Sequence, residues 1–125
     1  MCSSDLAGID APGYCEGNVL PCRDDEARAQ DREYLLTEWD SEHGPINMHL
    51  KTIYHRDGWL CTAYQPSHLY DGSEGELYNL SEDPDQLVNL WDDAGYATRR
   101  NQLVEQLWQV LPPQREPRLE RLAPV

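Results

Sequence analysis

The sequence has no phenylalanine and only one lysine, Lys51, among its 125 residues. Its 10 basic residues are outnumbered by 23 acidic ones, giving a formal net charge of −13. A surface this acidic repels nucleic-acid phosphates and anionic membranes, so we expect neither class of partner. Apolar runs of about 18 residues, which a transmembrane helix needs, are missing, and so is a signal-peptide pattern. We attribute the acidity to solubility.

The cysteines show neither a zinc-binding nor a redox pattern. No C-x-x-C pair occurs, and no histidine stands at zinc-finger spacing. Two disulfides are allowed by the spacing but not required by it, and we expect free thiols. The four residues are Cys2, Cys15, Cys22 and Cys61.

Alternating aromatic and aliphatic residues predict strands over residues 33–39, 48–55, 59–64 and 76–80. Apolar residues at helical spacing from Tyr96 to Leu111 predict a helix that ends at Pro112-Pro113, with Asp92 or Asp93 as its cap. The fold class expected from these elements is α+β. It is a small antiparallel sheet of three to four strands packed against one C-terminal amphipathic helix.

The pair Asp57-Gly58 between two alternating runs predicts a hairpin with a two-residue type I′ turn. That turn pairs Tyr54 with Cys61 and places both on one face, with Ile53 on the other. Because both faces then carry apolar groups, we expect this hairpin to lie in the centre of the sheet and to be covered on both sides. The C-terminal helix would provide one cover.

Residues 75–90 read G-E-L-Y-N-L-S-E-D-P-D-Q-L-V-N-L. This run resembles the pattern G-E-L-Y-D-L-x-x-D-P-x-E-x-x-N-L near the C-terminus of arylsulfatase-like enzymes of the alkaline phosphatase superfamily. Departures are Asn79, where Asp is usual, and Gln86, where Glu is usual. Residues 6–12 (L-A-G-I-D-A-P) and 49–59 (H-L-K-T-I-Y-H-R-D-G-W) extend the resemblance, which implies the C-terminal subdomain of an N-terminally truncated sulfatase.

The resemblance also implies an organisation in three parts. Residues 1–32 would be the exit segment and linker from a missing catalytic domain, and residues 33–111 the subdomain itself. Residues 112–125 would form a proline-rich, loosely ordered tail. Residues 2–6 (C-S-S-D-L) match the translation of a common sequencing adaptor, so we expect the first six residues to be a scar.

Membership of this family implies hydrolysis of sulfate esters. Sulfatases use a formylglycine made within a C/S-x-P-x-R motif, together with a divalent cation such as calcium. No cysteine here is followed by that motif. We therefore expect no catalytic residue, metal ligand or cofactor in this fragment, and no activity from it alone. Its implied partner is the catalytic domain of the parent chain, whose cleft it would help to wall.

His49, Lys51 and His55 share one face of a predicted strand, and a lysine and protonated histidines attract sulfate. They are our candidates for the rim of a cleft that binds a sulfated small molecule or sugar, with a merely polar surface as the alternative. Lys51→Ala would then change substrate affinity more than stability. Glu38 and Asp40 stand two apart, and we assign them to a polar strand end rather than to acid–base catalysis.

Two other functions remain open at this point. Relatives in the same superfamily cleave phosphonate or phosphate esters, and the residues that separate them from sulfatases lie outside this segment. An independent acidic interaction module, whose sheet binds a partner, is the alternative from another functional class.

Overall fold

The computed structural model describes residues 32–43 and 46–113. The chain divides into two compact units, Met1–Arg32 and Glu33–Val125, and the structure described here belongs to the second unit. The expected adaptor scar, exit segment and linker, the thiols of Cys2, Cys15 and Cys22, and the tail after Pro113 lie outside the described residues.

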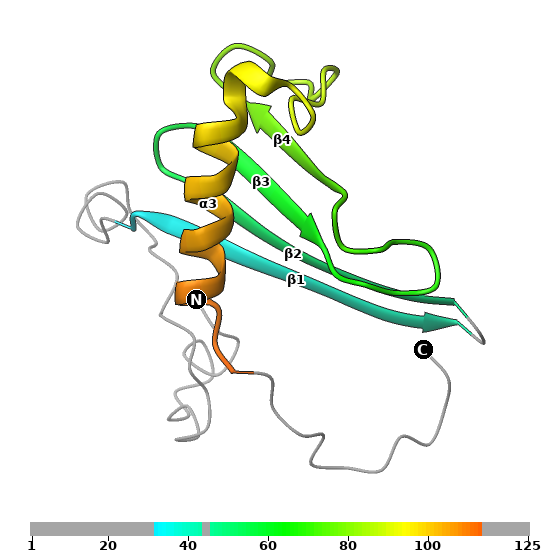
Figure 1. Ribbon diagram of the computed structural model, residues 1–125. Coiled ribbons are helices and arrows are strands. Elements are labelled where there is room, and N and C mark those ends of the chain that lie inside the picture. Colours follow the sequence, from blue (N-terminus) through cyan, green and yellow to red (C-terminus); the bar gives the residue numbers. More distant parts are fainter. Residues whose placement is uncertain (1–31, 44–45, 114–125) are drawn as a thin grey trace, which may run out of the picture. The chain divides into compact units, whose positions relative to one another are not determined.

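Four strands and one C-terminal helix make up the described unit (Figure 1). The strands form one antiparallel sheet in the order β1-β2-β3-β4, so each strand pairs with its neighbour in sequence. The predicted α+β fold and the central place of the β2-β3 hairpin are confirmed. The elements are β1 (Tyr34–His43), β2 (Ile46–His55), β3 (Trp59–Tyr64), β4 (Gly75–Asn79), the 3₁₀ turn η1 (Ala94–Tyr96) and α3 (Ala97–Val110).

The hairpin of β1 and β2 is longer than the sequence pattern predicts. The expected strands end at Trp39 and begin at Met48, whereas the pairing continues until His43 lies opposite Ile46. Each further pair of an antiparallel ladder satisfies backbone groups of both strands. This gain outweighs the low strand preference of the polar residues that follow Trp39.

The turn between β2 and β3 differs from the predicted one. Gly58 N donates to His55 O at 3.0 Å, and Gly58 has a φ of 91°. The loop therefore has three residues, a type I turn followed by a glycine in the left-handed region. Ile53 pairs with Cys61 and Thr52 with Thr62, so the predicted register was wrong by one residue. This shift brings Ile53 and Cys61 onto the same face.

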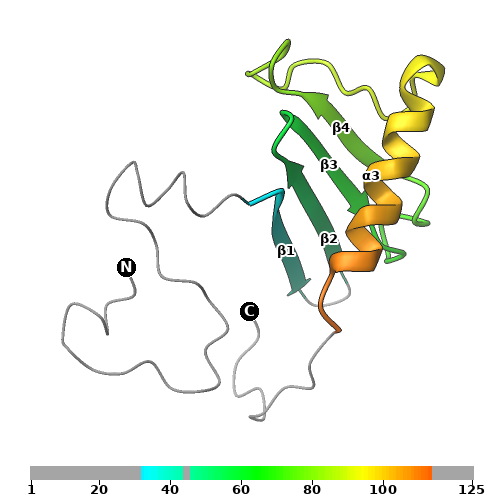
Figure 2. The same cartoon turned by 90° about the vertical axis from the view of Figure 1, so that its left-hand side faces the viewer.

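The helix α3 covers that face of the sheet (Figures 1 and 2). Leu103 and Leu107 of the predicted helix are buried, whereas Trp108 is 44% exposed. Asp93 Oδ1 accepts from Gly95 N at 2.7 Å, which confirms the predicted cap, although it caps η1 just before the helix. The core consists of Ile53, Cys61, Ala63, Leu77, Trp91, Leu103 and Leu107.

Cys61 is a core residue and not a reactive thiol. It is fully buried and free of any disulfide. Burial raises the pKa of the Cys61 thiol to about 12, and the nearby charges of Arg99 and Arg100 offset this only in part. The thiol therefore stays protonated at neutral pH and packs as a small apolar group.

The outer edge of β4 is closed by the side-chain amide of Asn89 and by a backbone bond in which Leu90 N donates to Leu77 O at 2.9 Å. Leu77 N donates to Asn89 Oδ1 at 3.0 Å, and Asn89 Nδ2 donates to Gly75 O at 3.0 Å. Trp91 N donates to the same Asn89 oxygen at 3.0 Å. The amide thus takes the place of a further strand along this edge, which would otherwise present unpaired backbone groups.

The acidic turn before Asn89 is held by Asp83. Its two carboxylate oxygens accept from Leu87 N and Val88 N at 3.0 and 2.9 Å, and so satisfy two backbone amides of the turn. The side chains of Leu87 and Val88 are themselves 80% and 61% exposed. Of the three apolar residues in this segment, only Leu90 packs against the core.

We expect Asn89→Ala to lower the free energy of unfolding by roughly 1–3 kcal/mol, because three partly buried backbone groups lose their partner. Urea denaturation followed by tryptophan fluorescence measures this. Gln102→Ala is the control, since Gln102 is an exposed helix residue. Equal midpoints for the two variants would show that the amide does not hold β4.

Candidate functional site

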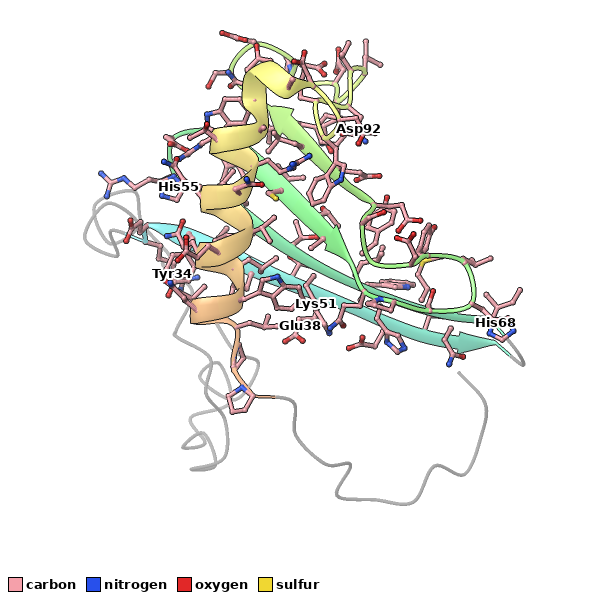
Figure 3. The ribbon with its side chains drawn as sticks, in the orientation of Figure 1. Tyr34, Glu38, Lys51, His55, His68 and Asp92 are labelled. Carbon is pink, nitrogen blue, oxygen red and sulfur yellow. The ribbon has the colours of Figure 1, made fainter. Side chains whose placement is uncertain are left out.

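The three predicted rim residues do share one face of β2, the face that α3 covers. Lys51 lies opposite Glu38 on β1 and Ala63 on β3. His49 lies beside Lys51, whereas His55 is at the far end of the strand, as Figure 3 shows for Lys51 and His55. The structure therefore brings together two of the three.

Lys51 is bound by two carboxylates. Its Nζ donates to Glu38 Oε2 at 2.9 Å and to the Asp40 oxygens at 3.0 and 2.8 Å. His49 Nδ1 lies 2.8 Å from Asp40 Oδ1. Lys51 is only 5% exposed. The two acids form, with His49 and Lys51, an acid–lysine cluster in which opposite charges face each other across neighbouring strands.

This cluster was not predicted from the sequence, because Glu38 and Asp40 were expected only to form a polar strand end. The two acids are nevertheless two residues apart, as are His49 and Lys51. Side chains at such spacing share a face of the sheet. The equal spacing of the two pairs could have indicated the cluster. It does so only when the pairing of β1 with β2 is known.

The cluster shifts the pKa values of two of its groups. Burial by itself raises the pKa of Asp40, but hydrogen bonds from Lys51 and His49 outweigh it and hold the pKa below its ordinary value of 3.8. Burial also lowers the pKa of Lys51, and its bonds to Asp40 and Glu38 more than compensate, so that pKa lies above 10.5. Both groups are therefore charged over the neutral range.

His55 belongs to a second polar cluster, at the β2-β3 turn. Its Nδ1 lies 2.6 Å from Asp57 Oδ1, and Arg99 of α3 pairs with the other oxygen of Asp57. The Arg99 guanidinium also lies 5.7 Å from the centre of the Trp59 ring. These contacts tie the first turn of the helix to the hairpin loop.

Each predicted rim residue thus has an acidic partner within the unit. Lys51 in particular presents no free ammonium group to a sulfate, which favours a structural role. The rim role of His49, Lys51 and His55 stays a prediction.

Within residues 32–43 and 46–113, no three His, Cys, Asp or Glu side chains are grouped as a metal site requires. The divalent cation and the formylglycine that the sulfatase resemblance implies thus find no fitting residues in this part of the chain. The same residues contain no helix long and apolar enough to cross a membrane.

The sheet face opposite α3 is the second candidate site. Figure 2 shows the helix against one face and no described element against the other. Thr52 and Thr62 lie at the centre of this open face and are joined by a hydrogen bond of 2.9 Å. The open face consists of Leu35, Thr37, Trp39, Leu50, Thr52, Tyr54, Leu60, Thr62, Tyr64, Glu76 and Tyr78.

Exposure on the open face is concentrated over β1 and β2. Leu35, Trp39 and Tyr54 are 47%, 61% and 37% exposed, whereas Tyr78 on β4 is 9% exposed. Large apolar side chains grouped in this way are characteristic of a surface that another protein part covers. The central hairpin was expected to be covered on both sides. Within the described unit, α3 covers one face, and no described element covers the other.

No protein-family model matches the chain. A curated protein, Delta 4,5-hexuronate-2-O-sulfatase of Bacteroides thetaiotaomicron, is 28% identical over 94 residues. The match covers 74% of this chain but 18% of that protein, so the chain spans less than a fifth of its relative's length. The match indicates a sulfatase-related region in this chain.

We expect Lys51→Met to lower the free energy of unfolding at pH 7 by about 1–2 kcal/mol. The loss is moderate because Glu38 and Asp40, whose side chains are 41% and 42% exposed, can regain water. Combined with Asp40→Asn, Lys51→Met should cost less than the sum of the two single changes. Thermal unfolding of the 125-residue chain measures these differences.

The pH dependence of the stability lost in Lys51→Met follows from the titration of Asp40. Its pKa is lowered in the folded state, so its contribution is present above the ordinary value of 3.8 and disappears as pH falls through the lowered value. The difference in melting temperature between the native chain and Lys51→Met should therefore shrink below about pH 4. A difference that stays constant to pH 2 would contradict this account of the cluster.

Proposed function

We propose that this chain is the C-terminal subdomain of a sulfatase, and that its open face packs against the catalytic part of the same enzyme. The observation that supports this proposal is that the two faces of the sheet differ. The helix α3 buries one face, while Leu35, Trp39 and Tyr54 stay exposed on the other. The parent enzyme would hydrolyse sulfate esters, and this part would wall one side of the substrate cleft. Its own residues would take no part in the reaction.

The residues that carry the resemblance support a structural role. Gly75 leaves no room for a side chain, because a Cβ there would lie 2.5 Å from Thr62 O and 2.6 Å from the Trp91 ring. The polar side-chain atoms of Asp83 and Asn89 form hydrogen bonds with backbone amides and with one carbonyl. The motif therefore builds the β4 edge and offers no nucleophile.

The name of the relative supports a sulfated sugar as the substrate class. That name gives a 2-O-sulfated hexuronate as the substrate of the relative. By extension, we propose a sulfated sugar as the substrate of the parent enzyme. A phosphonate or phosphate ester hydrolase of the same superfamily is the alternative, since the residues that separate the two chemistries lie elsewhere. An independent interaction module would use the same open face for a separate partner.

The gene upstream of Leu6 tests the proposal directly. We expect it to encode a C/S-x-P-x-R motif within a large α/β domain, and we expect the 125-residue chain alone not to hydrolyse p-nitrophenyl sulfate. Both expectations follow because the described residues supply neither the nucleophile nor a metal site. Metal-dependent turnover by the 125-residue chain would overturn the proposal.

The packing role predicts that one substitution is harmful in the longer protein and nearly neutral in the 125-residue chain. In a longer polypeptide with the upstream region, Leu35→Arg should lower the melting temperature and the specific activity, because it places a charge in a buried contact. In the 125-residue chain the same change should be nearly neutral, because Leu35 is half exposed there.

Leu87→Arg is the matched control, since Leu87 is 80% exposed and lies outside the open face. Equal effects of the two substitutions in the longer polypeptide would argue against docking through the open face. Cooperative melting of the 125-residue chain, with no upstream sulfatase region in the gene, would favour the independent module.

A further inference from the structure

A hollow of about 340 Å³ lies between α3, the end of β3 and the loop that leads to β4. Its size is at the lower end of the range for small-molecule sites, roughly 300–1,000 Å³. The helix contributes Arg100, Asn101 and Trp108, and Gln65 follows β3. Trp91 completes the wall from the segment before η1.

Aromatic and amide side chains dominate this hollow. Trp91 is 8% exposed, and its Nε1 donates to Ser73 O at 2.9 Å, so its ring is fixed in place. Trp108 is 44% exposed and presents a large flat surface. Asn101 and Gln65 add amide groups that can both donate and accept. A flat apolar wall beside such groups suits a ring that carries hydroxyls.

Among the described residues that line the hollow, Arg100 is the one that carries a charge. Its Nη1 donates to Trp91 O at 2.6 Å and its Nε to Asn101 Oδ1 at 3.3 Å, with the guanidinium 5.4 Å from the centre of the Trp91 ring. These contacts fix the plane of the guanidinium. Within the described part of the chain, Nη2 has no hydrogen bond and is available to an anion.

Glu74 and Glu76, in the loop and strand beside the hollow, have hydrogen-bond partners other than Arg100. Glu76 accepts from the Tyr64 hydroxyl at 2.6 Å, and Glu74 accepts from the amides of Asp71 and Gly72 at 3.1 Å each. Tyr64 and Gly72 line the hollow, whereas Asp71, Glu74 and Glu76 do not. Among the described residues, the lining carries the guanidinium of Arg100 and no carboxylate, which favours an anionic ligand over a cationic one.

We propose that this hollow binds one pyranose ring carrying an anionic group, either a carboxylate or a sulfate ester. Arg100 would bind the anion, Trp108 would lie against the ring, and Gln65 and Asn101 would bind hydroxyls. The choice of a sugar rests on the proposed function, but binding here needs no catalytic partner. The hollow would hold a sugar unit of the substrate apart from the one that reacts.

The test is a titration of the ¹⁵N-labelled 125-residue chain, followed by NMR at the tryptophan indole groups. The probes are methyl β-D-glucuronide, glucose 6-sulfate and the neutral methyl β-D-glucoside. We expect saturable binding of at least one anionic sugar, with Kd on the order of 1 mM, and about tenfold weaker binding of the neutral sugar. The indoles of Trp91 and Trp108 should shift, and that of Trp39 should not.

Substitutions then assign the binding to the hollow. Trp108→Leu should weaken binding about tenfold, and Trp39→Leu, at an exposed tryptophan on the open face, should leave it unchanged. Arg100→Gln should remove the preference for the anionic sugars, and Arg100→Lys should restore part of it. Melting curves of each variant show that the fold is retained.

Equal affinity for all three sugars, or no saturation with any of them, would overturn the inference. A preference for the glucuronide over the sulfate, or the reverse, supports it and identifies the anion. An upstream sulfatase region without sugar binding would overturn this inference and leave the proposed function intact. Sugar binding by a chain whose gene has no upstream sulfatase region would support this inference and overturn the proposed function.

Discussion

The hydrogen bonds of Asn89 join the edge of β4 to the segment that leads into the helix. Its amide closes the edge of β4 and also accepts from Trp91 N. Trp91 then packs on Gly75, where a side chain would not fit, and its carbonyl accepts from Arg100. Through this sequence of contacts one side chain links the sheet edge to the helix. The same contacts build the wall of the hollow, so the edge and the candidate sugar site depend on one residue.

The sequence predicted the fold because its two periodicities are clear. Period-two runs locate the strands, and the 3.6-residue spacing of Leu103 and Leu107 locates the helix. The register was not predictable in the same way. An Asp-Gly pair fits both a two-residue turn and the three-residue loop that occurs. The observed register places Ile53, Cys61 and Leu77 together under α3, so burial of the core decides between turns that the local sequence leaves equivalent.

The candidate site was predicted less completely than the fold. Lys51 stands out as the one lysine of the chain, but its partners Glu38 and Asp40 are 13 and 11 residues away in sequence. Only the β1-β2 pairing places them opposite each other. The hollow had no local pattern at all, because its residues come from a strand end, a loop and a helix. The orientation of Arg100 depends on its hydrogen bond to Trp91 O, nine residues earlier in the sequence, which no local pattern indicates.

The open face and the strong negative charge together favour a tethered neighbour over a diffusing one. A net charge of −13 opposes the approach of a second acidic copy, so it protects Leu35, Trp39 and Tyr54 from self-association. It does not by itself attract an apolar partner. A covalently linked partner needs no such attraction, because the linker supplies a high effective concentration. The apolar part of this face is therefore better suited to a neighbour in the same polypeptide, which supports the proposed packing against a catalytic part of the same enzyme.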